Sequence, residues 1–364
     1  MTGSPALSLA DFEAGARAVL SPDVWDFVAG GSGAETTLRA NRLALDAVSV
    51  YPRVLGGGLT ATGTTMLGSR LSMPVAVAPM AYQRLVHAAG EIAMAEAACQ
   101  AGIPMMVSAL SSCSVEDVAR TGADLWFQLY WIRERDRLER LIGRAEAAGC
   151  TALAVTVDVP IMGRRLRDVG NQFALPTGVV AANLSEGAAS RAHEATAGES
   201  AVAAHTAQLF GPALTWSDLE WLRGRSSLPM IVKGILDRRD AARAVGIGVD
   251  AVVVSNHGGR QLDGAPASIT ALAGVVAEVG QQCPVLLDSG LRGGMDVLRA
   301  LALGACGVLI GRPLLWALAV GGSDAVGAAL ALLATELRES LILTGCADVA
   351  DAANLQTDQG SCHR

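Results

Sequence analysis

The chain has 364 residues, of which 51% are hydrophobic and 17% charged, and its net charge is −7 at pH 7. This composition is typical of a globular protein, and the length suits either two average domains or one large barrel. The acidic balance, with arginines spread along the chain, argues against a nucleic-acid-binding protein. The seven cysteines include no CxxC pair, and the histidines show no ligand spacing, so we expect neither a disulfide framework nor a metal site.

The N-terminus carries Asp11 and Glu13 before any long apolar run, which argues against a signal peptide. The longest uncharged stretches, around residues 97–115 and 313–323, are interrupted by Gly, Pro and Ser. We therefore expect no membrane span and a cytoplasmic protein.

Short apolar runs alternate with alanine-rich segments of helical spacing after an N-terminal segment, residues 1–65, that we expect to be helical. The predicted strands are Val75–Ala78, Met105–Val107, Leu125–Leu129, Ala152–Val157, Met230–Val232, Ala251–Val254, Val285–Leu287 and Gly307–Ile310. The predicted helices are Glu91–Cys99, Arg135–Ala148, Arg238–Val245, Ile269–Val279 and Met295–Leu303. Such alternation predicts an α/β fold with a parallel sheet.

Eight such strands favour a closed (β/α)₈ TIM barrel over a doubly wound open sheet. We predict one domain over residues 1–364, with the barrel at 66–345 and a C-terminal tail at 346–364. The connection after the fourth strand is unusually long. Its middle, Ala181 to Gln208, is rich in Ala, Ser, Glu and Thr, so we interpret residues 176–215 as a flexible lid over the active-site face.

Polar residues follow the predicted strands where those strands end. Because the carboxyl ends of barrel strands share one rim, these residues should form a ring. The ring consists of Gln128, Tyr130, Thr156, Asp158, Lys233, Ser255, His257 and Asp288.

The most informative stretch is Ser255 to Gly264, with the sequence SNHGGRQLDG, directly after a buried strand. His257 can move protons near neutral pH, and Arg260 can hold a carboxylate bidentately. A lone histidine at a strand end is more often structural, but its neighbours favour proton chemistry on an organic acid.

Lys233 is the only lysine among 28 basic Lys and Arg residues, and it also follows a buried strand. It can stabilise an anion or form a Schiff base, and both options stay open. The glycine-rich segments Asp288–Gly294 and Gly311–Pro313 follow the last two strands, where barrels commonly bind phosphate through backbone N–H groups and arginines.

From Trp25 to Arg312 the chain resembles the FMN-dependent 2-hydroxy acid oxidase and dehydrogenase family. The segment Ser255–Asp263 matches that family's signature, and the segment Thr156–Asp168 is most similar to its 4-hydroxymandelate oxidases. The resemblance implies FMN across the barrel mouth, with its phosphate at Arg292, Gly311 and Arg312 and with Lys233 beside the flavin. The cofactor-binding residues that it implies are Pro79, Met80, Ala81, Ser108, Gln128, Thr156, Lys233, Ser255, Asp288, Ser289, Gly290, Arg292, Gly311 and Arg312.

The resemblance also implies that Arg165 and Arg260 clamp the substrate carboxylate while Tyr130 binds its hydroxyl. His257 is then the base and Asp158 its partner, with electrons leaving the α-carbon either as hydride or after removal of the α-proton. The alternatives are that Arg165 lies on the surface, that Tyr130 merely caps the barrel, and that Asp158 pairs with an arginine.

Two positions depart from the small-acid oxidases of this family. Phe27 stands where glycolate oxidase has a tyrosine, and Leu110 where it has a tryptophan. Both changes favour an apolar, aryl substituent, so we expect oxidation of an (S)-2-hydroxy acid such as 4-hydroxymandelate or mandelate to the phenylglyoxylate. Lactate or glycolate remains an alternative.

Acidic residues in the long connection argue against the apolar anchor of the membrane-bound dehydrogenases, so O₂ is the expected acceptor and H₂O₂ the product. Three other readings remain: a flavin-dependent oxidase of a peptide-derived product, a flavin-binding module without turnover, and a Schiff-base aldolase using Lys233. By resemblance we expect a homotetramer.

Overall fold

The computed structural model describes residues 6–56, 60–184, 191–193, 200–211 and 214–358. Its centre is a closed parallel barrel in the strand order β10-β11-β4-β5-β6-β7-β8-β9. The barrel strands are β4 (Val75–Val77), β5 (Met105–Ser108), β6 (Leu125–Leu129), β7 (Ala152–Thr156), β8 (Met230–Ile235), β9 (Ala251–Val254), β10 (Val285–Leu287) and β11 (Gly307–Ile310). The predicted TIM barrel is confirmed, and every predicted strand is present within two or three residues at its ends.

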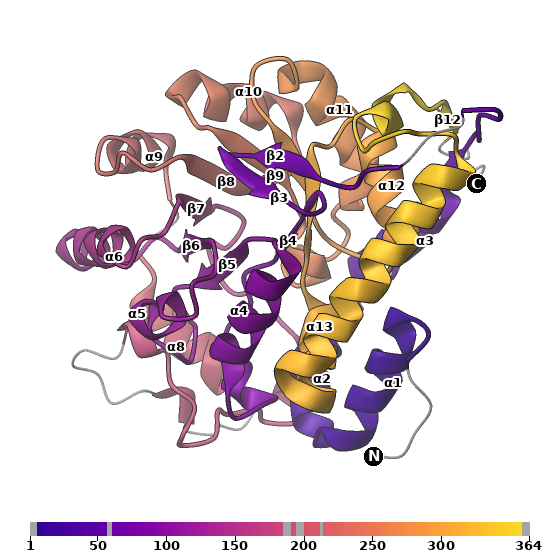
Figure 1. The fold of residues 1–364 in the computed structure, drawn as a ribbon. Helices are drawn as coiled ribbons and strands as arrows, with labels where there is room; N and C mark the ends of the chain where they lie inside the picture. Colours follow the sequence, from indigo (N-terminus) through magenta and orange to yellow (C-terminus); the bar gives the residue numbers. More distant parts are fainter. Residues whose placement is uncertain (1–5, 57–59, 185–190, 194–199, 212–213, 359–364) are drawn as a thin grey trace.

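Helices surround the barrel on its outside (Figure 1). The helices predicted from the alanine-rich segments are α4 (Gly90–Ala101), α6 (Arg135–Ala147), α10 (Arg238–Ile247), α11 (Ser268–Val279) and α12 (Gly294–Ala302). The remaining helices are α1 (Leu9–Val19), α2 (Pro22–Ala29), α3 (Thr36–Ala47), α5 (Val115–Ala119), α7 (Leu166–Gly170), α8 (Ala201–Leu209), α9 (Trp216–Arg223) and α13 (Arg312–Leu343). Short 3₁₀ helices are η1 (Gln83–Leu85), η2 (Ala182–Leu184), η3 (Arg191–His193), η4 (His257–Gly259) and η5 (Asp351–Asn354).

The barrel strands are buried throughout because their side chains face either the helices or the barrel interior. The inward-facing side chains form a separate apolar cluster that includes Met106, Trp126 and Leu286. A hairpin of β2 (Thr64–Met66) and β3 (Ser69–Leu71) adds Met66 and Leu71 to this cluster. The barrel interior is therefore a packed core, and the space for a ligand lies at the carboxyl ends of the strands.

Two segments far apart in the sequence pair in a way that the sequence did not predict. Strand β1 (Ser49–Val50) pairs antiparallel with β12 (Thr357–Asp358). The segment before the barrel is thus not helical throughout, and the segment after it is not a simple tail. Two-residue strands carry too little periodicity to be recognised in a sequence.

Helix α13 is, within the described part of the chain, the one helix long and apolar enough to cross a membrane by length and composition. Its course is interrupted at Gly321 and Gly322, the latter at φ +63°. It packs against α1, α4 and α12 and buries Leu330, Leu333 and Leu337. A helix packed in a protein core can be as apolar as a membrane-spanning helix, so length and composition alone do not distinguish the two.

The long connection after β7 is partly described. It contains α7, the short turns η2 and η3, and α8, while residues 185–190, 194–199 and 212–213 of the predicted lid lie outside the described residues. Helix α8 brings Val202 and Thr206 to the lining of the cavity described next, and the flexible lid itself stays a prediction.

Candidate active site

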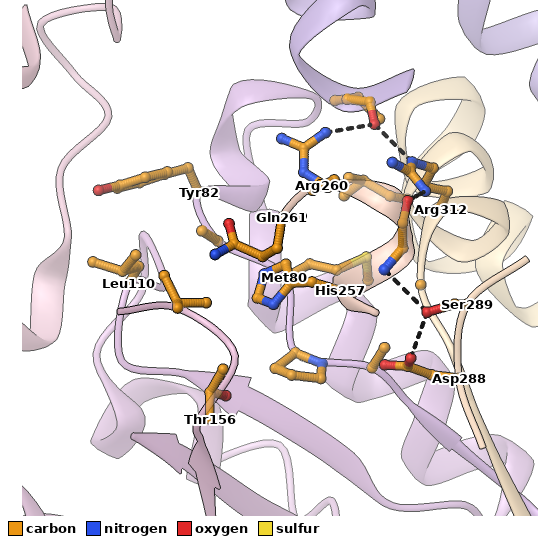
Figure 2. Close-up of a pocket in the computed structure, with 18 of the residues that line it drawn as sticks. Met80, Tyr82, Leu110, Thr156, His257, Arg260, Gln261, Asp288, Ser289 and Arg312 are labelled. Carbon is orange, nitrogen blue, oxygen red and sulfur yellow. Dashed lines mark hydrogen bonds between the residues drawn. The ribbon is translucent and has the colours of Figure 1, made fainter. Parts of the chain in front are cut away.

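A cavity opens at the carboxyl ends of the barrel strands, and most of the predicted site residues line it (Figure 2). Those that line it are Phe27, Pro79, Met80, Ala81, Leu110, Tyr130, Thr156, Arg165, Lys233, His257, Arg260, Asp288, Ser289, Gly290, Arg292, Gly311 and Arg312. The others, Ser108, Gln128, Asp158 and Ser255, are not part of the lining, and each hydrogen-bonds to a residue that is, Ser108 through the backbone N–H of Leu110.

His257 faces the cavity from η4 with its backbone in the left-handed region at φ +58°. Its Nδ1 lies 3.1 Å from Oδ1 of Asp158, and its backbone N–H donates to Ser255 Oγ at 3.0 Å. Because Nδ1 is engaged, Nε2 is the nitrogen available to a molecule in the cavity. Gly234, at φ +112°, lets Asp158 approach, since a Cβ there would lie 2.6 Å from the Asp158 side chain.

Asp158 lies mostly buried beside this histidine, two residues after the end of β7. Burial alone would raise the pKa of its carboxyl, but His257 and Lys233 outweigh it and hold the pKa below 3.8. The carboxylate therefore stays charged at neutral pH, and it can stabilise positive charge on the imidazole. Its Oδ2 has no hydrogen-bond partner among the described residues.

The loop that carries His257 is held by the N-terminal helix α3. The buried amides of Asn41 and Asn256 exchange hydrogen bonds of 2.9 and 2.7 Å. Gly259 packs on α3 at φ +74°, where a Cβ would lie 2.6 Å from Leu38 Cα. The paired glycines of the signature therefore serve close packing.

Lys233 lies within β8, opposite Thr156 in the neighbouring strand, and not after the strand as predicted. Its Nζ makes an ion pair of 2.7 Å with Asp288 and donates to Ser255 Oγ at 2.9 Å. Burial would lower the pKa of this ammonium, but Asp288 and Asp158 raise it above 10.5. A protonated, ion-paired lysine is a poor nucleophile, which argues against the Schiff-base alternative.

A polar chain runs behind the cavity wall. Ser108 Oγ donates to Gln128 Oε1 at 2.9 Å, and Gln128 Nε2 donates to Thr156 Oγ1 at 3.0 Å. Of these three residues only Thr156 reaches the cavity. The chain fixes which way the Thr156 hydroxyl and the Gln128 amide point.

Two arginines flank one aromatic ring. The Cζ atoms of Arg165 and Arg260 lie 6.0 and 5.4 Å from the ring centre of Phe27. Arg260 donates to the Gly30 carbonyl at 2.7 Å, whereas Nε of Arg165 has no hydrogen-bond partner among the described residues. Burial and the nearby Arg260 lower the pKa of Arg165, and Asp168, 3.9 Å away, offsets this only partly. The two guanidinium groups therefore form a cationic site that suits an anion such as a carboxylate.

Tyr130 completes this part of the cavity. Its ring stacks on Phe210 with centres 4.6 Å apart. Burial, with Asp158 adding to it, raises the pKa of the phenol well above 10. The hydroxyl therefore stays protonated and can donate a hydrogen bond.

A second cationic region lies at the ends of β10 and β11. Arg312 donates to the carbonyls of Val28 and Gly30 at 3.0 and 2.8 Å, and Arg292 donates to its neighbour Leu291 at 2.9 Å. Across the described residues, neither guanidinium has an ion pair with a carboxylate. Burial, together with Arg260, Arg292 and Arg165, lowers the pKa of Arg312 well below its usual value. An anion bound here would relieve that repulsion.

Some lining residues were not among the predicted site residues. They include Tyr82, Met162, Val202, Thr206, Phe210 and Gln261. Gln261 belongs to the signature and could have been named from it, since its amide also holds the Asp158 and Ile161 carbonyls. The residues of α8 and Phe210 lie in a connection without a motif, so no sequence signal marks them. Within the described residues no cluster of His, Cys, Asp or Glu could hold a metal ion.

Comparison with known proteins agrees with this geometry. The profile of the family "FMN-dependent dehydrogenase" matches residues 16–358. The chain is 53% identical to 4-hydroxymandelate oxidase of Amycolatopsis orientalis, over 97% of this chain and 99% of the relative. It is 46% identical to L-lactate oxidase of Nostoc sp., over 96% and 97%. A crystal structure of mandelate oxidase with (S)-4-hydroxymandelic acid superposes with a TM-score of 0.95 at 52% identity, covering 97% of this chain and 99% of that one.

Proposed function

Because the chain belongs to the FMN-dependent dehydrogenase family, we propose that it oxidises (S)-4-hydroxymandelate to 4-hydroxyphenylglyoxylate and reduces O₂ to H₂O₂. One observation carries the proposal. The buried Arg165 and the partly buried Arg260 flank Phe27, and within the described residues neither has a carboxylate in hydrogen-bonding contact. His257 lines the same cavity, and its partner Asp158 adjoins it. The cavity thus offers adjacent sites for the carboxylate and the aryl group of a substrate, next to a histidine that can accept a proton.

The residues present fit FMN. Arg292 and Arg312 are partly buried cations without an acidic partner in the described chain, and they follow the two barrel strands whose ends commonly bind phosphate. Ser289, Gly290 and Gly311 line the same end of the cavity and would hold the phosphate and ribityl groups with them. We assign Lys233 and Thr156 to the isoalloxazine, where an ammonium favours negative charge. The remaining cofactor contacts would be Pro79, Met80, Ala81 and Asp288, with Ser108, Gln128 and Ser255 behind them.

When bound, FMN supplies the acceptor for the two electrons that leave the substrate α-carbon. Arg165 and Arg260 bind and orient the substrate carboxylate by charge-assisted hydrogen bonds. Tyr130 donates its hydroxyl hydrogen to the substrate oxygen. His257 takes a proton at Nε2, and Asp158 stabilises the imidazolium through Nδ1. Water is kept out by the apolar wall of Leu110, Met162 and Phe210.

The aryl preference rests on the shape of the apolar wall. Phe27 stacks on Phe173 with ring centres 4.5 Å apart and adds no hydroxyl to the cavity. Leu110 is smaller than the tryptophan of glycolate oxidase. Both residues suit a ring, and the names of the relatives 4-hydroxymandelate oxidase and mandelate oxidase point the same way. We further propose that the protein is cytoplasmic and forms a homotetramer. Light scattering of the purified protein would test the tetramer.

The function is tested by the absorbance spectrum of the purified protein under anaerobic conditions. We expect 4-hydroxymandelate and mandelate to bleach the flavin bands, and air to restore them with release of H₂O₂. Faster bleaching by lactate would overturn the aryl assignment. Flavin that no hydroxy acid bleaches would overturn the oxidase itself and favour a peptide-derived substrate or a module without turnover.

A further inference from the structure

A second cavity lies beneath the N-terminal helices and shares one described lining residue, Arg292, with the active-site cavity. The lining of the second cavity includes Arg17, Trp25, Arg292 and Trp316. The guanidinium of Arg292 therefore stands between the two spaces. What holds it there decides where its donors point.

Arg292 is held mainly by an aromatic face. Its Cζ lies 4.8 Å from the ring centre of Trp316. The only side-chain hydrogen bond it makes within the described residues goes to the Leu291 carbonyl, next to it in the chain, at 2.9 Å. A guanidinium over an indole face is held by attraction to the ring and not by hydrogen bonds, so most N–H donors of Arg292 stay available to an anion.

Trp316 is itself immobilised. It is 1% exposed, and it stacks on Trp25 of α2 with ring centres 6.2 Å apart. Trp25 in turn contacts Arg17 of α1, whose Cζ lies 5.8 Å from the ring centre of Trp25. Two stacked indoles thus connect Arg17 on α1 with Arg292 after β10.

The position of Trp316 in α13 adds to the argument. Arg312 is the first residue of this helix, and Trp316 follows one turn later. The same rigid turn therefore fixes Arg312 directly and Arg292 through the indole. Burial lowers the pKa of Arg292, and Glu13 partly offsets this, so a bound anion would stabilise the charged guanidinium.

We propose that Trp316 is a positioning residue for the cofactor phosphate: its indole holds the guanidinium of Arg292 so that Arg292 and Arg312 meet the same phosphate group. This inference rests on the proposed function, because the phosphate is that of FMN. Trp25 and Arg17 brace the indole from behind.

The test compares two flavins that differ only in the phosphate. The full chain is purified, depleted of flavin, and titrated with FMN and with riboflavin by quenching of flavin fluorescence. In Trp316→Met we expect the Kd for FMN to rise about tenfold, the scale of a buried cation–π contact, while the Kd for riboflavin changes less than about twofold. In Trp316→Phe, which keeps an aromatic face, the FMN Kd should rise only about twofold to threefold.

Trp221 supplies a matched control. Arg225 lies 4.8 Å from its ring centre, the same distance as in the proposed pair, and Trp221 lines neither cavity. Trp221→Met should leave the ratio of the two Kd values unchanged. In an Arg292→Leu background, Trp316→Met should have no further effect on that ratio, since the indole acts through Arg292.

The outcomes separate the two proposals. Equal affinity of the wild type for FMN and riboflavin would overturn the phosphate site of the proposed function. A wild type that prefers FMN, with the preference intact in Trp316→Met, would overturn the role of Trp316 alone. Equal weakening of both flavins would also overturn it, because a merely structural role predicts that result. If the methionine variant does not fold, an unchanged ratio in Trp316→Phe overturns the inference.

Discussion

The cavity has two halves that are assembled from very different parts of the chain. The charged half consists of Lys233, His257, Asp288, Arg292 and Arg312, all from the ends of β8 to β11. The apolar half consists of Phe27, Leu110, Met162, Val202 and Phe210, which come from α2, the loop after β5 and the long connection after β7.

The two halves are also held differently. In the charged half, ion pairs and hydrogen bonds fix single atoms, such as the 2.7 Å contact of Lys233 with Asp288. In the apolar half, stacked rings fix whole surfaces, as with Phe27 on Phe173 and Tyr130 on Phe210. Single substitutions in the charged half should therefore cause large losses of reaction rate. Substitutions in the apolar half should cause graded changes in substrate selectivity.

The largest effect is expected at the base. His257→Asn should slow anaerobic flavin reduction by 4-hydroxymandelate about 10³-fold, because general base catalysis contributes on this scale. Flavin content should be unchanged, and stopped-flow absorbance measures both. A rate within tenfold of wild type would place the base elsewhere in the charged half.

The next effect is expected at the arginines that border both halves. Arg165→Met should lower kcat/KM about 100-fold, since it removes a buried, charge-assisted contact to the substrate carboxylate. Steady-state peroxide release measures it. The adjacent Arg164 is exposed, so Arg164→Met serves as the matched control and should be near wild type. Equal losses in both variants would contradict the clamp.

A smaller effect is expected in the apolar half. Leu110→Trp should lower kcat/KM for mandelate about tenfold relative to lactate, because a larger side chain fills the space of the aryl ring. Both acids are measured with one preparation, so differences in flavin content cancel in the ratio of their kcat/KM values. A ratio that does not move would mean that Leu110 is not part of the aryl wall.

The smallest effect concerns stability. The pKa of Asp158 in the folded protein is below 3.8, its usual value, chiefly because His257 and Lys233 overcome the cost of burial. Its ionisation therefore contributes stability that is present above pH 3.8 and is lost as pH falls through the folded pKa. The free energy of unfolding of wild type minus that of Asp158→Asn should be constant near neutral pH and shrink in acid. Denaturant titrations over a range of pH measure this difference. A difference that grows in acid would contradict a lowered pKa of Asp158 in the folded protein.

Most of the fold was predictable because barrel strands carry a strong local signal. Runs such as Ala251–Val254 are apolar on both faces, and in the segments between such runs the apolar residues recur at helical spacing. The pairing of β1 with β12 and the hairpin of β2 and β3 were not predicted, since two or three residues per strand show no period. Lys233 was placed after its strand, whereas β8 continues through it to Ile235.

The sequence by itself determined the barrel, the family and the chemical groups at the strand ends, because these depend on residue type and on short spacings along the chain. Only the tertiary structure decided that Nδ1 of His257 faces Asp158, that Lys233 is paired with Asp288, and that Trp316 stacks on Arg292. The physical reason is distance along the chain. Contacts between residues many positions apart depend on how the segments pack, and a linear pattern does not record that packing.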